Sequence, residues 1–381
     1  AQVMIILTIL HTILFVWAAA SIVYVAIFAI AARLEDTGYP LSEGTDHPVR
    51  LCLIYPAYAE DRVILTSINA ALEEVSHTPH CVIVVSDHMQ PETNDALAQK
   101  PITLLIADYS PSSKARALQL AARHIPAEAT HVVILDADNL VQAGFAEQLC
   151  RCAMLGGDRE VQQCHRCALN LDTSTARLDA VSEEINNSVF RRGHNALGMS
   201  AALIGSGMCF PKEWFLTHVD HLTTSGEDKE FEAMLLKEGM KVRFLDEILV
   251  LDHKVQSSGG FAGQRRRWLA AQFHTLFTML PRVPSALFHR RFDFVDKCLQ
   301  QALMPRSVLL LVCAAMTLLR PVLWGTLFAI LITALLLAVP RNLYTRRLLS
   351  DIMHVPHLAA IMLLSIFHLR GQSKTFSHTK H

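Results

Sequence analysis

Near the start of the chain, the 30 residues from Val3 to Ala32 contain no Asp, Glu, Lys or Arg. An α-helix needs about 20 apolar residues to cross the hydrocarbon core of a bilayer, so this run is long enough to span a membrane. It is too long for the apolar core of a signal peptide, and it lacks a basic lead-in and a convincing cleavage site. We therefore predict a membrane anchor that is retained.

A second apolar zone lies near the end of the chain, from Ala302 to Val339. The pair Arg320-Pro321 divides it, and two closely spaced spans account for this pattern better than one. Further on, His357–Leu369 is apolar but only 13 residues long, which suits a helix lying at the membrane interface. A tilted fourth span is the alternative for this stretch. The sequence therefore predicts about three transmembrane helices and C-terminal interfacial helices.

Charge is divided unevenly along the chain. Residues 1–258 contain 19 Lys and Arg against 32 Asp and Glu, a net charge of −13, whereas residues 259–381 contain 15 against 3, a net charge of +12. An acidic first part disfavours binding to nucleic acid, and a basic, apolar last third favours contact with anionic membrane lipids. Arginines follow the first and last spans (Arg33, Arg341, Arg346 and Arg347). The positive-inside rule then places the acidic middle in the cytosol, on the inner face of the cell membrane.

The middle of the chain alternates apolar strands with helical patterns, which is typical of an α/β fold with a mostly parallel sheet. The predicted strands are Leu51–Tyr55, Cys81–Ser86, Ile102–Ile106 and His131–Leu135, and the predicted helices are Glu60–Ser76 and Ser113–His124. In such sheets, ligands bind beyond the carboxyl ends of the strands. Polar side chains follow the strands at these ends, namely Tyr58, Glu60, Asp87, Asp136 and Asp138.

Carboxylates dominate these strand ends. No G-x-G-x-x-G follows the first strand and no G-x-x-x-x-G-K-[ST] occurs, which disfavours dinucleotide-binding and P-loop readings. Extended backbone repeats its side-chain direction every two residues, so Asp136 and Asp138 are expected to face one cleft while Ala137 faces away. Two such carboxylates suit Mg²⁺ or Mn²⁺, which would neutralise a diphosphate. A solvated turn is the alternative for an isolated D-x-D.

Nine cysteines in a protein with a cytosolic body are expected to be thiols. The series Cys150, Cys152, Cys164 and Cys167 has spacing that could hold zinc. An ordinary helix followed by a strand is the favoured interpretation, because C-x-C is unusual in structural zinc sites.

Seven short motifs follow one another along the chain, namely Pro56-Ala57-Tyr58-Ala59-Glu60, Ser86-Asp87, Lys114 to Leu118, Asp136-Ala137-Asp138, Gly205-Ser206-Gly207, Glu227-Asp228 and Gln264 to Trp268. With these motifs in this order, the chain resembles glycosyltransferase family 2, the inverting GT-A transferases, and within it the membrane-embedded branch that contains cellulose, chitin and hyaluronan synthases. Two motifs depart from the family pattern: Ala59 stands where Asn is usual, and Gly226 where Thr is usual. The C-terminal Phe376–His381 partly resembles the gating loop of cellulose synthases, and a frayed polar terminus is the alternative.

The resemblance implies a role for each motif. Asp228 would be the general base, and its predicted place in the first turn of a helix favours the ionised form that a base needs. Donor binding would fall to Tyr58, Glu60, Asp87, Lys114, Asp136 and Arg267, with Asp138 and Asp136 at the metal. Acceptor binding would fall to Gly205, Ser206, Gly207, Glu227, Gln264 and Trp268.

Helical spacing places Gln264, Arg267 and Trp268 on one face, where Arg267 could hold leaving-group phosphate and Trp268 could stack on a sugar. The neighbours Arg265 and Arg266 would turn toward lipid phosphate, since an interfacial helix also uses arginine as an anchor. The chain thus divides into an anchor (1–33), a catalytic domain (48–258), interfacial helices (259–300), two transmembrane helices (301–340) and a basic tail with interfacial helices (341–381).

The sequence therefore predicts a membrane-bound glycosyltransferase of GT-A type that moves a sugar from a nucleotide-diphosphate sugar to a growing polysaccharide. Single-sugar transfer to a lipid acceptor is the alternative within the same class. Three transmembrane helices are too few to enclose a polysaccharide channel, so export of the polymer would require a homo-oligomer or an export partner. An alternative of another class is a membrane scaffold or receptor whose nucleotide-binding domain has lost its chemistry.

Overall fold

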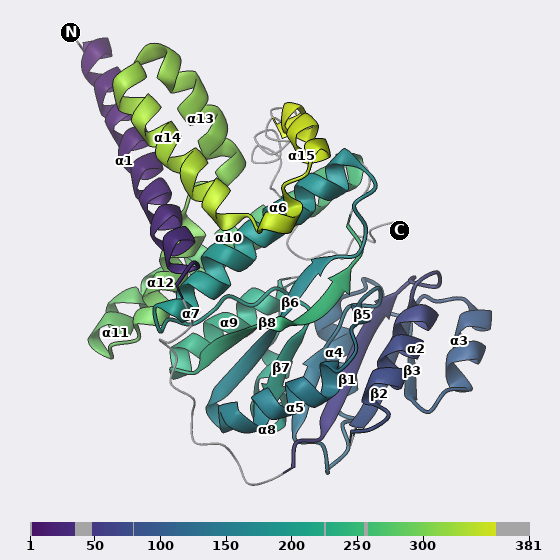
Figure 1. Cartoon of the computed structure of the whole chain (residues 1–381). Helices are drawn as coiled ribbons and strands as arrows, with labels where there is room; N and C mark the ends of the chain where they lie inside the picture. The colour runs from purple at the N-terminus through teal and green to yellow at the C-terminus, as the bar shows by residue number, and fades with distance from the viewer. Residues whose placement is uncertain (1, 35–47, 79, 225, 255–257, 356–381) are drawn as a thin grey trace.

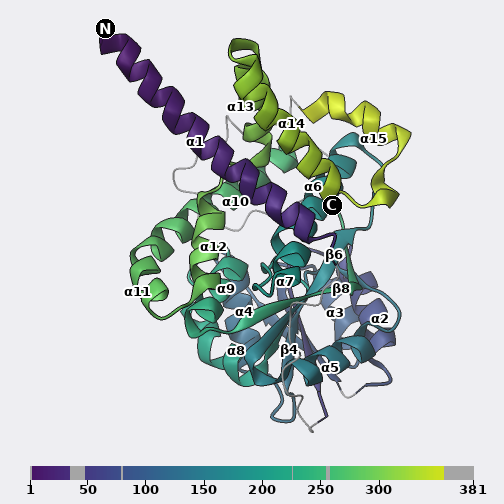
Figure 2. The same ribbon diagram turned by 60° about the vertical axis from the view of Figure 1, so that its left-hand side comes forward.

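A computed structural model of the chain describes residues 2–34, 48–78, 80–224, 226–254 and 258–355, although the side chains of residues 258–268 and of Leu349 are not described. The described residues form an α/β domain from which a bundle of apolar helices projects (Figures 1 and 2). The stretch His357–Leu369 and the tail from Phe376 to His381 lie outside the described residues.

The described part of the domain is built on an eight-stranded sheet with the order β3-β2-β1-β4-β7-β6-β8-β5. Its strands are Leu51–Tyr58 (β1), His80–Asp87 (β2), Thr103–Ala107 (β3), His131–Ile134 (β4), Leu140–Val141 (β5), Glu160–Ala168 (β6), Met208–Pro211 (β7) and Lys241–Asp252 (β8). The half from β3 to β4 is parallel, which confirms the four predicted strands. In the other half only β6 and β8 pair in parallel, so the sheet is mixed.

Strand β1 continues three residues past its predicted end, through Pro56 to Tyr58. Strand β4 stops pairing with it at Ile54, whose carbonyl accepts a hydrogen bond from Leu135. Alternate residues of a strand present their backbone groups to the same side, so the missing N–H of Pro56 faces the side where the ladder has already ended. The proline therefore costs no ladder hydrogen bond, and β1 carries Tyr58 to the edge of the site.

Helices cover both faces of the sheet (Figure 1). They are Ile64–Val75 (α2), Pro91–Ala98 (α3), Lys114–Ala122 (α4), Phe145–Gly156 (α5), Ser174–Asn187 (α6), Gly193–Ala196 (α7), Lys212–His218 (α8), Glu227–Glu238 (α9) and Ser258–Met279 (α10). The alternation of β1 creates two cores, since Leu53 and Tyr55 pack with α2 and α5 while Cys52 and Ile54 pack with α4 and β7. Each fully buried aliphatic side chain contributes about 1.5–3 kcal/mol.

The cysteine-containing segment forms α5 followed by β6, as predicted, and the nine cysteines are free thiols. Within the described ranges, no group of three or more His, Cys, Asp or Glu side chains is arranged to hold a metal ion.

The remaining helices are Gln2–Ala31 (α1), Val283–Phe288 (α11), Phe292–Ala302 (α12), Arg306–Leu319 (α13), Pro321–Ala338 (α14) and Arg346–Asp351 (α15). Helices α1 and α14 are long and apolar enough to span a membrane, with mean hydropathies of 2.6 and 2.2. Helix α13 begins at Arg306 rather than Ala302, because α12 ends there and the two helices meet at a 55° bend. Its 14 residues reach about 21 Å, so α13 alone is shorter than a bilayer core of about 30 Å.

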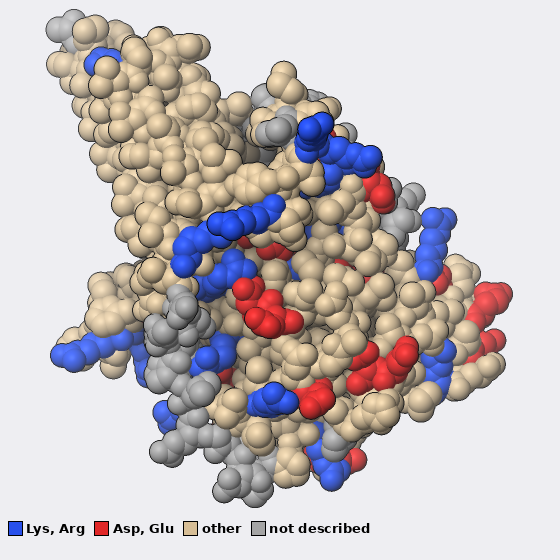
Figure 3. Space-filling model, viewed as in Figure 1, with Lys and Arg blue, Asp and Glu red and all other residues tan. Residues whose placement is uncertain are grey.

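The bundle is held by apolar side chains from all three helices, among them Ile22 of α1, Leu309 of α13 and Trp324 of α14. Figure 3 shows it almost without charged side chains, whereas basic side chains gather where it meets the domain. This distribution matches a membrane-facing bundle above a headgroup-facing belt.

The C-terminal end of α1 is fixed by contacts with α7 and α12. The ring of Phe28 stacks on His194 with centroids 3.7 Å apart, and the hydroxyl of Tyr24 donates to Asp296 Oδ1 at 2.7 Å. A Cβ on Gly193 would lie 2.3 Å from the carbonyl oxygen of Phe28, so only glycine permits this approach. The contact places the side of α1 next to the site described below.

Candidate active site

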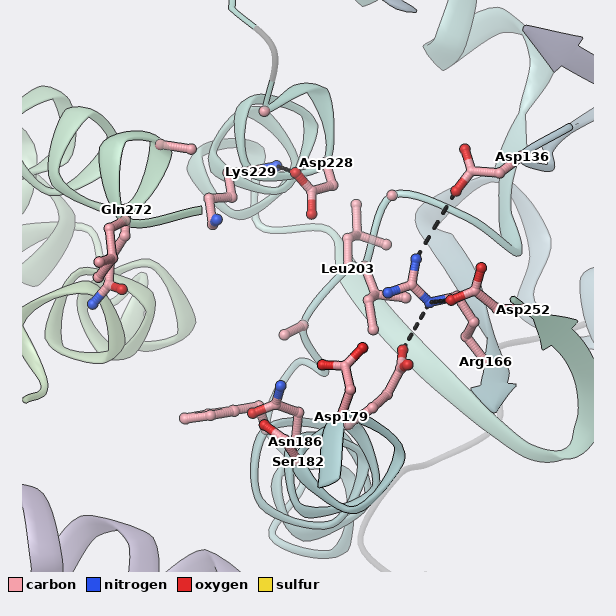
Figure 4. A pocket seen from close by; sticks show the side chains of 18 of the residues that line it. Asp136, Arg166, Asp179, Ser182, Asn186, Leu203, Asp228, Lys229, Asp252 and Gln272 are labelled. Atoms are coloured by element: carbon pink, nitrogen blue, oxygen red, sulfur yellow. Dashed lines mark hydrogen bonds and ion pairs between the residues drawn. The ribbon is translucent and has the colours of Figure 1, made fainter. Parts of the chain in front are cut away.

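The carboxyl ends of β1, β2 and β4 open into a cavity of about 630 Å³. Most of the residues predicted to bind the donor or the metal line it, from three strand ends and the start of α4: Tyr58, Glu60, Asp87, Lys114, Asp136 and Asp138. Gly205, Glu227 and Asp228 line it as well, and Figure 4 shows Asp136 and Asp228 entering from different elements. The tertiary structure thus brings six of the seven motifs to one cavity.

Asp87 is buried at the end of β2 and is held from several directions. Its Oδ1 accepts from the backbone N–H of Tyr109 at 3.1 Å and lies 2.6 Å from His88 Nδ1, and its Oδ2 accepts from the Ser112 hydroxyl. His88 also meets the ring of Tyr58 edge-on at 5.5 Å. Sequence analysis missed His88, although a histidine directly after the motif aspartate was the available signal.

The turns after β1 and β2 are strained. Ala59 and His88 both have positive φ, 54° and 57°, and Ala59 N–H donates to the Asp87 carbonyl at 3.0 Å. Such backbone in a non-glycine residue costs about 1–3 kcal/mol and clusters at functional sites. The turn at Ala59 also explains why α2 begins at Ile64 rather than at Glu60, since the Glu60 carbonyl first accepts from Val63 and Ile64.

Lys114 connects four of the motifs. Its Nζ lies 2.6 Å from Asp136 Oδ1 and 3.0 Å from Glu227 Oε1, and donates to the Gly205 carbonyl at 2.7 Å. Burial alone would lower the pKa of Lys114, but the carboxylates of Asp136 and Glu227 outweigh burial and raise it. A permanent cation therefore joins the D-x-D motif to the predicted acceptor loop and base motif.

The D-x-D motif lies on a turn and not on extended backbone, which corrects the sequence expectation. Strand β4 ends at Ile134, and Asp136 and Asn139 exchange hydrogen bonds across the turn. As a result Ala137 lines the cavity together with both aspartates instead of facing away. Asp138 is buried, and the side-chain amide of Asn139 donates to it at 3.2 Å.

The acidic residues here fit a divalent cation. Burial and the charges of Asp138 and Asp136 raise the pKa of Glu60 to about 8, which is the effect of carboxylates crowded without enough positive charge. Two aspartates alone are too few ligands for Mg²⁺ or Mn²⁺, so oxygens from a bound diphosphate would have to complete the set. The donor set present in this chain is therefore compatible with a metal-diphosphate complex.

A buried ion-pair network that sequence analysis missed borders the same aspartates. Arg166 of β6 lies 2.7 Å from Glu183, 3.6 Å from Asp252 and 3.9 Å from Asp136 (Figure 4). Lys254 adds a second cation 2.8 Å from Asp252. The residues come from β6, α6 and β8, whose proximity only the sheet order reveals.

The predicted acceptor loop needs its glycines. Gly205 and Gly207 have φ of 82° and 67°, which favours glycine, and a Cβ on Gly207 would press on Cys164 at 3.1 Å. A Cβ on Gly205 would lie 3.6 Å from Glu227 Oε1 and 3.9 Å from Asp228 Oδ2. Gly205 faces the cavity, whereas Ser206 is buried behind it and donates to Asn139.

Asp228 lies in the first turn of α9, as predicted, and is partly exposed to the cavity. Its Oδ1 accepts from the backbone N–H of Lys229 at 2.8 Å. The neighbouring Glu227 is buried, and burial raises its pKa while Lys114 opposes the rise. The two adjacent carboxyl groups therefore differ in environment, and Asp228 is the more accessible of the two.

Gln264, Arg267 and Trp268 lie on α10, which supports the predicted helical spacing, but their side chains are outside the described set. Leu269, Ala271 and Gln272 of the same helix line the cavity. The backbone of α10 therefore passes the site.

Comparisons with known proteins agree with this fold. One similar solved structure is a mannosyltransferase from Pyrobaculum calidifontis in complex with GDP-mannose and Mn²⁺, at 16% identity and a TM-score of 0.51, covering 86% of this chain and 99% of that one. Another is glucosyl-3-phosphoglycerate synthase from Mycobacterium tuberculosis with Mn²⁺, UDP and phosphoglyceric acid, at 14% identity and a TM-score of 0.44, covering 62% and 86%. No curated protein matched in the sequence comparison. The model of glycosyl transferase family group 2 matches residues 131–368, more than half of the sequence, and the chain therefore belongs to that family.

Proposed function

We propose that this chain is a membrane-bound, metal-dependent, inverting glycosyltransferase that uses a nucleotide-diphosphate sugar. The observation that carries the proposal is the position of Lys114, which contacts Asp136, Glu227 and the Gly205 carbonyl at once. A donor-side aspartate and the predicted base motif therefore share one cavity, as transfer between two substrates requires. A scaffold that had lost its chemistry would have no need for this arrangement.

On the donor side, Asp87, Tyr58 and Glu60 would hold the nucleoside, and Lys114, Asp136 and Arg267 would support the diphosphate. Asp138 and Asp136 would hold Mg²⁺ or Mn²⁺, which when bound neutralises charge on the leaving diphosphate. The mannosyltransferase from P. calidifontis, which shares this fold, binds GDP-mannose and Mn²⁺, and we propose ligands of the same classes here.

On the acceptor side, Asp228 would take the proton of an acceptor hydroxyl as that oxygen forms a bond to the anomeric carbon. The bond from that carbon to the diphosphate oxygen breaks in the same step, and the nucleoside diphosphate leaves with the electron pair. A single displacement inverts the configuration and forms no sugar-enzyme intermediate. Gly205, Glu227, Gln264 and Trp268 would hold the acceptor, with Ser206 and Gly207 supporting the loop from behind.

The proposed membrane arrangement follows from the apolar helices and the arginines beside them. Helices α1 and α14 would cross the bilayer, and α12 with α13 would form a third, bent crossing. Arg33 after α1 donates to the backbone carbonyl of Val339 after α14, and this contact supports an arrangement in which the two ends would lie on one side of the membrane. That side would be the cytosol, with the catalytic domain beneath the inner face of the cell membrane.

The acceptor would be either a growing polysaccharide, as the motif pattern implies, or a lipid. A polysaccharide would need a channel to which a second copy or an export partner contributes. The lipid alternative is favoured by a specific observation, because the cavity continues from Asp228 to side chains of α1, α13 and α14. The length of the product that the purified protein makes from radiolabelled donor distinguishes the two acceptors: long chains indicate a polysaccharide, and a lipid carrying one sugar indicates a lipid acceptor.

Two variants test the chemistry. Asp228→Asn should lower transfer by about 10²–10⁴-fold while nucleotide binding, measured by calorimetry, is retained. Asp138→Ala should remove the part of nucleotide binding that depends on added Mg²⁺ or Mn²⁺. The matched control is Asp220→Asn at an exposed position outside the cavity. Near-normal turnover in Asp228→Asn would refute the base assignment.

A further inference from the structure

The cavity extends well beyond the proposed donor residues and changes character along its length. Its far part is lined by apolar side chains from the helices that meet the bundle, namely Val25 (α1), Val181 and Ile185 (α6), Leu310 (α13) and Leu335 (α14). Polar residues of α6, Ser182 and Asn186, line the same cavity beside Asp179 (Figure 4). One continuous space therefore joins a charged region to an apolar one beside the predicted membrane spans.

Lys229 is the unusual charge in this space. It follows Asp228 in α9 and lines the cavity on the side of Gln272 (Figure 4). Its Nζ makes no hydrogen bond or ion pair with any residue that the structure describes. The other buried lysines do: Lys114 meets Asp136 at 2.6 Å, and Lys297 meets Glu232 at 2.7 Å.

A partly buried cation that has no partner among the described residues is unfavourable, and burial accordingly lowers the pKa of Lys229. An anionic ligand group placed beside it would remove that cost. Lys229 follows the proposed base Asp228 directly in α9 and therefore lies on the side of the cavity that is assigned above to the acceptor.

A second cation stands at the apolar part of the cavity. Arg306 begins α13, where the chain turns into the bundle, and donates to the carbonyl and hydroxyl oxygens of Ser182 at 3.0 and 3.2 Å. Apolar walls with cations at their polar border match the surface of a lipid that has a negatively charged headgroup.

We propose that the acceptor is an anionic phospholipid-type molecule that enters from the bilayer, with its chains against α1, α6, α13 and α14 and its phosphate beside Lys229. This inference rests on the proposed function and names its acceptor class. A headgroup hydroxyl would then face Asp228 and lose its proton there as the glycosidic bond forms and the nucleoside diphosphate departs.

The test measures occupancy of the cavity separately from catalysis. The full chain is placed in phosphatidylcholine nanodiscs that contain a photoactivatable phosphatidic acid or the matching photoactivatable diacylglycerol, and labelled residues are mapped by mass spectrometry. Phosphatidic acid should label α6, α13 and α14 at the cavity, with diacylglycerol about tenfold weaker. Excess soluble glycerol 3-phosphate should compete poorly, because it lacks the chains.

Variants complete the test. Lys229→Gln should weaken phosphatidic acid labelling about tenfold and leave diacylglycerol labelling unchanged, while Lys229→Arg should retain the preference. Lys237→Gln, on the exposed side of the same helix, is the matched control and should change neither. Leu310→Trp should fill the apolar part and reduce labelling by both lipids. Nucleotide binding reports whether each variant is folded.

The inference is overturned if the two lipids label the cavity equally, if neither does, or if folded Lys229→Gln keeps the anionic preference. Its failure is distinguishable from failure of the proposed function. Asp228→Asn should lower transfer by about 10²–10⁴-fold and keep the lipid labelling, whereas Lys229→Gln should keep nucleotide binding and lose the lipid preference. A polymer acceptor would give lipid-independent product in both nanodisc types.

Discussion

Replacing Lys114 by methionine is the perturbation that most directly tests how the site is held together. The variant leaves the buried Glu227, whose side chain is 7% exposed, and the partly exposed Asp136 without their shared cation. Breaking a buried ion pair by removing one partner costs about 3–5 kcal/mol, and most of that cost here falls on Glu227 because Asp136 is solvated and near Arg166. For a domain of this size the unfolding temperature should fall by about 10 °C.

Differential scanning fluorimetry of the detergent-solubilised protein measures this loss, and calorimetry with nucleotide measures donor binding. The double variant Lys114→Met with Glu227→Gln should recover more than half of the lost stability, since glutamine removes the unpaired charge at constant shape. Lys237→Met on α9 is the control for losing a surface lysine and should shift the midpoint by less than about 2 °C. The ion-pair reasoning would be refuted if the unfolding temperature of Lys114→Met were no lower than that of the control. It would also be refuted if the double variant recovered none of the lost stability.

Two further predictions concern backbone and pH. Gly207→Ala should destabilise the protein by about 1–3 kcal/mol because of its positive φ and the contact at Cys164. Gly325→Ala inside α14 should be neutral or stabilising, since its Cβ would meet only Thr317 at 3.6 Å. Equal unfolding temperatures for the two variants would contradict this prediction. Burial lowers the pKa of His131 from 6.5 to about 4, so the unfolded chain binds the extra proton first as pH falls. Stability should therefore be complete above pH 6.5 and fall by about 3 kcal/mol toward pH 4, and His131→Leu should remove that part of the pH profile.

The docking of α1 on the α/β domain brings an apolar helix to the site. Tyr24 and Phe28 contact His194, and one turn of the same helix supplies Val25 to the cavity. The anchor helix is therefore part of the wall of the site as well as a tether.

Local sequence patterns determine much of the secondary structure of this protein. Uncharged runs determined α1 and α14, because a bilayer selects for length and hydropathy alone. Apolar runs determined β1, β2 and β4, because these strands bury side chains on both faces of the sheet, whereas the edge strand β3 is only partly buried. The order of the seven motifs was enough to indicate the family.

Other features depended on contacts between residues far apart in the sequence. The contacts of Lys114 with Asp136, Glu227 and Gly205 arise from the order of strands and the docking of α9, which no local pattern encodes. The same is true of the Arg166 network and of Lys229, which has no partner among the residues that the structure describes. The turn at Asp136 and the start of α13 at Arg306 also depend on tertiary contacts. Strand β4 ends at Ile134, before the turn, and α12 and α13 meet at a bend before Arg306. Local periodicity therefore determined which segments are helix, strand or membrane span, and tertiary packing decided which charges meet and where the cavity leads.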